Sequence, residues 1–265
     1  MQNKSKKIPK SAELMWILGI LTVALGVALC KKADLGVSMI AAPAFIVFEA
    51  LSSVWDWLTV GMTEYIIQGL LIIVLCAVVQ RIDWRYLTAF LTAVIYGYVL
   101  DMWFLILGNE PFSELYLRWI MLIVGDVITG FGVACFFRTY MPLQAYELFV
   151  AEVADRYKFA VNKTKWVYDI SSFVLSAILA LTIFGDVTTF DWSKIYKTGF
   201  HSIGLGTIVT TFINAPIITA WGKVIDKIFD YTPLFPKFRN LLERKKRSKD
   251  EPEERNDTDS TINNE

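Results

Sequence analysis

Six long apolar stretches dominate this chain and limit what it can fold into. Several approach the ~20 residues that a helix needs to cross a hydrocarbon core about 30 Å thick. Because backbone polar groups in hydrocarbon must be satisfied within the segment, we expect helices throughout. The sequence lacks the alternating pattern of a membrane β-barrel. The stretches cover about residues 14–30, 65–80, 86–107, 115–137, 166–185 and 203–221.

The composition supports a membrane location. Of the 265 residues, 55% are hydrophobic, and the charged residues crowd into the two ends and a few short loops. A soluble domain would spread its charges along amphipathic elements. The predicted fold class is therefore all-α, a polytopic membrane helical bundle. Its expected partner is the lipid bilayer.

Two shorter apolar segments, about 37–51 and 141–155, decide the predicted topology. Each is apolar for only about 12–15 residues and carries a proline near its start, Pro43 or Pro142. Such lengths suit re-entrant or oblique helices better than full spans. The prediction is six spans plus two short helices, with eight spans as the alternative.

The distribution of positive charge favours six spans. Lysines cluster within residues 1–13, and a second basic run lies at 244–247. By the positive-inside rule, both termini are expected in the cytoplasm. Six spans also place most loop cations on that side, whereas eight spans would scatter them. We expect a basic tail over 1–13, a membrane domain over 14–228 and a charged, largely disordered tail over 229–265.

The sequence also repeats itself. Five residues of the first stretch recur 106 residues later, and three residues of the third stretch recur 118 residues later. With six spans, repeat one (about 14–107) starts inside and repeat two (about 115–228) starts outside, which predicts an inverted repeat. Transport proteins often form binding sites where two such repeats meet. The matches are Gly19/Gly125, Gly26/Gly132, Val27/Val133, Ala28/Ala134, Lys32/Arg138, Thr92/Thr210, Ile95/Ile213 and Trp103/Trp221.

Several short motifs resemble those of the bacterial YczE/YitT-type integral membrane proteins. They are Ala33–Ser38 after the first span, Met141–Phe149 after the fourth, Tyr168-Asp169 in the next span and Gly204–Thr207 at the start of the last. The resemblance covers about residues 14–228. It implies a multi-pass protein of the bacterial inner membrane, but it supplies no substrate and no catalytic residues.

Ionisable residues inside the apolar stretches are the candidate site residues, because they are costly in lipid and usually face a bundle interior or a water-filled path. Asp126 lies about 11 residues into its span, roughly 16 Å at the helical rise, and is the most central carboxyl. We expect it to act in proton or cation coupling, or else to hydrogen-bond a neighbouring helix. Structural roles are favoured for Asp101 and Asp169. The short segments add Glu49, Glu147 and Glu152.

Three further polar residues complete the candidate set. In the repeat, Gln68 corresponds to Asp169, and Asn214 corresponds to Tyr96. Both halves therefore place polar side chains at similar depths, as a midplane site requires. His201 is the single histidine of the chain, although a lone histidine at an interface is more often simply solvated.

No enzymatic signature is visible. The sequence shows no nucleotide-binding glycine loop, no metal-ligand spacing and no nucleophile with a partnered histidine, so we expect no catalytic residue, no cofactor and no nucleic-acid partner. The leading hypothesis is a small secondary permease for an unknown small molecule or ion, in which a homodimer could enclose the pathway. The alternative is a membrane scaffold or accessory protein that acts through its tails.

Overall fold

The computed structural model describes residues 8, 12–108, 110–185, 200–236 and 239. Within these residues the chain forms eight α-helices and no β-strand beyond two isolated bridges. The lysines of the N-terminal tail before residue 11, the basic run 244–247 and the whole loop 186–198 lie outside the described residues. The helices are α1 (Ala12–Ala33), α2 (Ala42–Leu51), α3 (Val60–Val79), α4 (Trp84–Leu107), α5 (Leu115–Phe136), α6 (Ala145–Tyr157), α7 (Val161–Phe184) and α8 (Leu205–Ile228).

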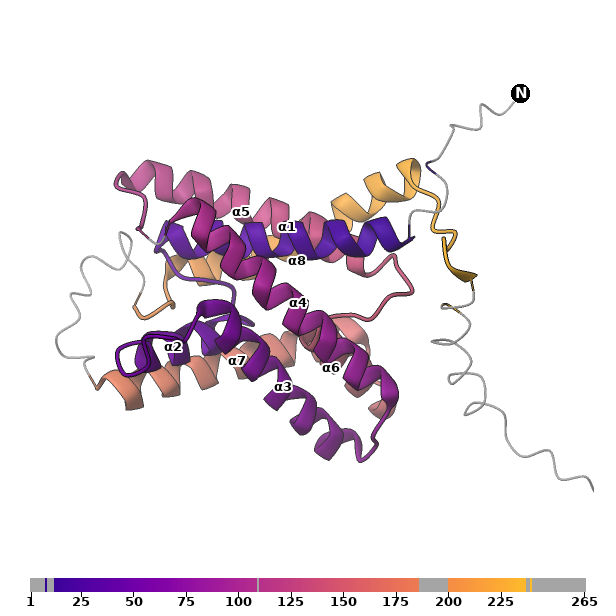
Figure 1. Cartoon of the computed structure of the whole chain (residues 1–265), viewed down its shortest axis with the longest axis horizontal. Helices are drawn as coiled ribbons and strands as arrows, with labels where there is room; N and C mark the ends of the chain where they lie inside the picture. The colour runs from indigo at the N-terminus through magenta and orange to yellow at the C-terminus, as the bar shows by residue number, and fades with distance from the viewer. Residues whose placement is uncertain (1–7, 9–11, 109, 186–199, 237–238, 240–265) are drawn as a thin grey trace, which may run out of the picture.

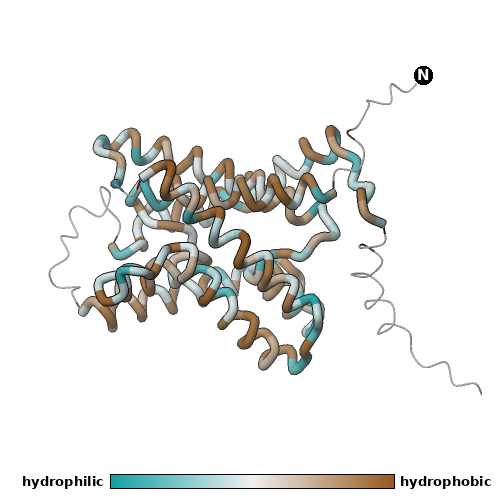
Figure 2. Tube along the Cα trace, viewed as in Figure 1, coloured by the Kyte–Doolittle hydropathy of each residue, from teal (hydrophilic) through white to brown (hydrophobic). Residues whose placement is uncertain are grey.

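Six of these helices are long and apolar enough to cross a membrane, namely α1, α3, α4, α5, α7 and α8. The trace is brown over most of their length and teal near the chain reversals (Figure 2). Many large apolar side chains on them point outward, as lipid contact requires. The predicted all-α polytopic bundle is confirmed, and α2 and α6 are the two short helices.

Local sequence explains where the helices begin and end. The Thr59 hydroxyl accepts a hydrogen bond from the Met62 amide at 3.1 Å and caps α3, and the Asp83 carboxylate accepts one from the Arg85 amide at 3.2 Å and caps α4. Gln80, with φ 53°, adopts the left-handed conformation that ends α3.

Helices α1 and α5 pack side by side along the upper edge of the bundle in the view of Figure 1 and run antiparallel. Gly19, near the start of α1, contacts Gly132 near the end of α5, while Gly26 contacts Gly125. The small residues let the two backbones approach closely. The antiparallel crossing agrees with six spans, since eight would make these two helices parallel.

The remaining contacts fall into matching sets. α4 packs on α1 as α8 packs on α5, and α2 packs on α7 as α6 packs on α3. Two pairs break the match across the described residues. α3 and α4 pack along each other whereas α7 and α8 barely touch, and α4 contacts α6 without a matching set of contacts between α8 and α2. The rings of Trp166 and Phe212, 5.9 Å apart, connect α7 and α8.

Both short helices start in the middle of the bundle and return towards the side from which their segment came. Ala42, at the start of α2, shares a core cluster with Val23 and Val27 of mid-α1, and Glu49 near the end of α2 binds Lys31 at the end of α1. We call the side of the bundle where α1 begins the amino-terminal face, and the side where α1 ends the opposite face.

Helix α6 follows the reverse course. It begins beside Gln68, midway along α3, where the Ala145 amide donates to the Gln68 side chain at 3.4 Å. It ends at the amino-terminal face, where the Tyr157 hydroxyl donates to the carbonyl of Val78 at 2.9 Å. Two helix starts therefore lie deep in the bundle, one from each half of the chain.

Candidate functional site

A central cavity of about 750 Å³ lies where the two short helices begin. The segment Ser38–Ala41 before α2 and residues Gln144–Glu147 at the start of α6 contribute to its wall, together with α7 and α8. A cavity of this size is typical of small-molecule sites. Polar side chains in its lining include Tyr96, Gln144, Glu147, Lys165, Asp169 and Asn214.

The cavity opens along the gap between α7 and α8, where exposed residues of α8 from Phe212 to Lys223 contribute to its wall. Lys165 and Trp166 belong to the first turns of α7, and the exposed residues Thr219 and Lys223 belong to the last turns of α8. The weak packing of α7 against α8 leaves this side open.

Two polar atoms at the start of α6 lack partners. The Gln144 side chain is only 3% exposed, yet its Nε2 has no hydrogen-bond acceptor, and the Oε2 of Glu147 is buried without a donor. An unsatisfied buried polar atom costs about 1–3 kcal/mol. Both residues line the cavity, which makes them a donor and an acceptor available to a ligand.

A charged pair on α7 forms the neighbouring wall. The Nζ of Lys165 lies 3.3 Å from a carboxylate oxygen of Asp169, one helical turn away. The structure thus brings the predicted residues Asp169 and Glu147 to one cavity. Lys165 pairs with Asp169 and also interacts electrostatically with Glu147.

Glu64 of α3 packs against the start of α6, outside the cavity lining, and has no exposed surface. Its Oε2 accepts hydrogen bonds from the Tyr146 hydroxyl at 2.8 Å and from Gln68 Nε2 at 3.4 Å. Its Oε1 has no partner. Gln68 therefore joins Glu64 to the first amide of α6 and does not reach the cavity lining.

Asp126 lies beside the cavity. It is 2% exposed, and its Oδ1 accepts a hydrogen bond from the Nδ2 of Asn214 at 3.0 Å, while its Oδ2 has no partner. Asn214 lines the cavity and Asp126 does not. Asp126 is thus buried, and its hydrogen bond to Asn214 joins α5 to α8 beside the cavity.

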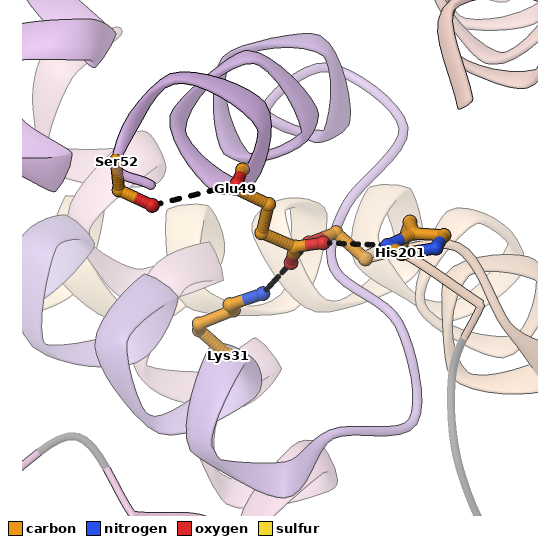
Figure 3. A network of polar contacts seen from close by, with 5 residues as sticks. Lys31, Glu49, Ser52 and His201 are labelled. Atoms are coloured by element: carbon orange, nitrogen blue, oxygen red, sulfur yellow. Dashed lines mark hydrogen bonds and ion pairs between the residues drawn. The ribbon is translucent and has the colours of Figure 1, made fainter. Parts of the chain in front are cut away.

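At the opposite face, Glu49 of α2 joins the end of α1 to the segment before α8 (Figure 3). It binds Lys31 of α1, accepts a hydrogen bond from the Ser202 hydroxyl at 2.6 Å and lies 3.2 Å from the Nδ1 of His201. The His201 ring stacks on Phe184 at the end of α7. His201 is therefore packed and paired, contrary to the expectation of a simply solvated side chain.

The charge on Glu49 is maintained by these partners. Burial disfavours the charged carboxylate, but Lys31, Ser202 and His201 outweigh burial and hold the pKa of Glu49 below its usual 4.5. The resulting contacts fasten the end of α2 to the segment before α8 and close the opposite face above the cavity.

Two predicted residues lie away from the cavity. Glu152, near the end of α6, pairs with Arg85 at 3.1 Å and accepts from the Tyr86 hydroxyl at 3.3 Å. Asp101 accepts from the Thr59 hydroxyl at 2.6 Å and from the Gly61 amide at 2.7 Å, so it holds the start of α3. These contacts match the structural role expected for Asp101.

Sequence reasoning missed Glu64, Gln144 and Lys165 as site residues. The apolar stretch was expected from 65 onward, whereas α3 begins at Val60, so Glu64 fell just outside the predicted stretch. In the described part of the chain, no group of three or more His, Cys, Asp or Glu side chains could hold a metal ion.

A family model for a family of unknown function, DUF6198, matches residues 10–223. No curated protein and no solved structure matches the chain. The match covers all of helices α1–α7 and most of α8, including every residue of the central cavity, but does not test the resemblance to YczE/YitT-type proteins. By its sequence this six-span helical protein belongs to the family of unknown function DUF6198.

Proposed function

We propose that this protein is a small secondary permease that moves a polar small molecule or ion through the central cavity. The observation that carries the proposal is the pair of unpartnered buried atoms in the cavity wall, Gln144 Nε2 and Glu147 Oε2. A bundle stabilised only by its own contacts gains nothing from leaving both atoms unsatisfied, whereas a ligand with an acceptor and a donor group would satisfy both.

The arrangement of the helices supports the proposal. We infer that the halves 14–107 and 115–228 form an inverted repeat, because α1 and α5 run antiparallel and the contacts of α4, α2 and α3 recur for α8, α6 and α7. Transporters with inverted repeats place their substrate between the two halves and expose it to each side in turn.

The difference between the halves supports alternating access. α3 and α4 pack together, while α7 and α8 leave the cavity open between them. The Glu49 contacts with Lys31 and Ser202 close the opposite face. In this proposal the described state is open to the amino-terminal face, which is the cytoplasmic side of a bacterial inner membrane, with both tails on that side.

A thermal-shift screen of detergent-purified protein tests the proposal. Amino acids, nucleobases, vitamins, sugars and common cations are compared on wild type, Glu147→Gln and Glu110→Gln, whose carboxyl lies on an exposed loop. A compound that binds the folded state raises the unfolding midpoint. We expect a shift that Glu147→Gln abolishes and Glu110→Gln retains.

A binding compound is then tested for uptake into proteoliposomes, with Asp126→Asn as a further variant. Uptake that is lost in Glu147→Gln, with the variant still folded, supports the permease. If no compound shifts any variant while all are equally folded, the result favours the scaffold alternative and directs the search to protein partners of the two tails.

A further inference from the structure

Glu64 is a carboxyl enclosed in the bundle without a compensating cation. It has no exposed surface, and no Lys, Arg or His in the part of the chain that the structure describes forms an ion pair with it. Its two hydrogen bonds come from neutral groups, the Tyr146 hydroxyl and the Gln68 amide. A buried carboxylate in this setting is costly, and a bound proton removes most of that cost.

Oε1 of Glu64 offers the place for such a proton. Oε2 receives both hydrogen bonds, whereas Oε1 has no partner and is buried. When the carboxyl is charged, Tyr146 and Gln68 stabilise it. When it is neutral, the acid hydrogen resides on one oxygen and the other still accepts. The site can therefore hold either state without rearranging the helices.

The surroundings of Glu64 contain phenols and, beyond them, two further carboxyls. Tyr96 of α4, Tyr146 of α6 and Tyr168 of α7 interact electrostatically with Glu64. Tyr168 also interacts with Glu147 and with Asp169, whose carboxylate is paired with Lys165. The remaining neighbour of α3, helix α2, has its one carboxyl, Glu49, at the opposite face. No cation faces Glu64 from these helices within the described residues, so its charge depends on the proton.

Tyr146 connects this carboxyl to the cavity. The residue lines the cavity and, at the same time, its hydroxyl donates to Glu64 Oε2 at 2.8 Å. A proton from cavity water can bind Tyr146 Oη while the hydroxyl passes its own proton to Glu64, and release reverses both transfers. One proton enters and one oxygen–hydrogen bond forms on the carboxyl, with the phenol unchanged.

We propose that Glu64 is a proton-binding site that is loaded and unloaded from the central cavity through the hydroxyl of Tyr146. In the permease proposed above, this proton would drive or accompany the substrate, and that extension alone rests on the permease function. Proton binding itself is a property of the folded protein and can be measured without any substrate.

Infrared difference spectroscopy of the purified protein tests the proposal, with the proton as the only ligand. Spectra are collected over roughly pH 5–9, where buried glutamates titrate, for wild type, Glu64→Gln and the exposed-loop control Glu110→Gln. We expect wild type and Glu110→Gln to show a carboxylic-acid C=O band that fades as pH rises, and Glu64→Gln to lack that component.

A band that stays constant over this range would show a permanently protonated, structural carboxyl and would overturn the proposal. So would a titrating band that survives intact in folded Glu64→Gln. If Glu64→Gln does not fold, Glu64→Asp replaces it. The band must then move in position, and an unmoved band assigns the titration to another residue.

Tyr146→Phe tests the route. The variant keeps the carboxyl and removes the relay hydroxyl, so hydrogen–deuterium exchange of the Glu64 band should slow at least about tenfold, whereas exchange at wild-type rate would exclude Tyr146. These spectra need no transported molecule, so the proton site and the permease are tested separately. A protein that transports nothing but binds a proton on Glu64 shows the titrating band without uptake. A permease whose Glu64 never titrates shows uptake without the titrating band.

Discussion

Gly26 of α1 approaches Gly125 of α5 so closely that a Cβ on Gly26 would lie 2.4 Å from the Gly125 carbonyl oxygen. The same Cβ would lie 2.2 Å from the Thr129 side-chain oxygen. The packing of α1 against α5 therefore depends on the absence of a side chain at this position.

We predict that Gly26→Ala lowers stability by about 1–3 kcal/mol, the usual cost of overpacking. The unfolding midpoint in detergent is the measurement. Gly69→Ala is the matched control, because its Cβ would meet only the movable ring edge of Phe90 at 2.9 Å. Equal midpoints for the two variants would mean that the α1–α5 crossing is looser than described.

Asp101 is expected to act in stability and not in ligand binding. Its carboxylate accepts from the Thr59 hydroxyl and the Gly61 amide at the start of α3. Asp101→Asn should cost about 1–3 kcal/mol, because an amide group cannot accept both bonds. In a double-mutant cycle, the variant that carries both Asp101→Asn and Thr59→Ala should lose less stability than the sum of the two single losses. A strictly additive result would argue against the direct contact.

The Glu49 contacts should give a pH-dependent contribution to stability. The folded pKa of Glu49 lies below its ordinary 4.5, so the stabilisation is complete above about that pH and is lost as pH falls through the folded value. We expect Glu49→Gln to lower the unfolding midpoint at neutral pH by about 2–4 °C, equivalent to about 1 kcal/mol. The difference should vanish in stronger acid, and a difference that persists there would contradict the assignment.

The cavity should be accessible from the amino-terminal face only. In a background with Cys76→Ser, Thr219→Cys in the cavity wall should react with a membrane-impermeant maleimide added on the side of α1's start. Ser53→Cys, exposed after α2, should react from the other side. Labelling of both cysteines from one side would exclude the described topology.

Sequence patterns predicted the helices well because membrane spans are determined by length and hydropathy. The stretch predicted at 115–137 is α5, Leu115–Phe136, and the short segment at 141–155 contains α6. The four glycines of the repeat, Gly19, Gly26, Gly125 and Gly132, also lie where α1 and α5 meet, with Gly19 against Gly132 and Gly26 against Gly125. Close helix approach in lipid requires such small residues.

The site was predicted less completely. Hydropathy shows that a polar side chain is costly in lipid, but it does not show which neighbours that side chain faces. Glu147 and Asp169 were expected and line the cavity, but Asp101, also expected, caps a helix. Glu64 was missed because the polar pair Thr63-Glu64 looks like the end of a loop, and only the packing of α6 shows that the helix had already begun.

The interlocked pairing of the short helices has a consequence for how the protein is made. α2 packs on α7, and α6 packs on α3, so each half supplies the partner of the other half's short helix. During synthesis α2 leaves the ribosome long before α7 exists. With only 10 residues it cannot cross the bilayer alone. We therefore expect α2 to wait at the membrane surface, and the opposite face to close only after the translocon has released α7.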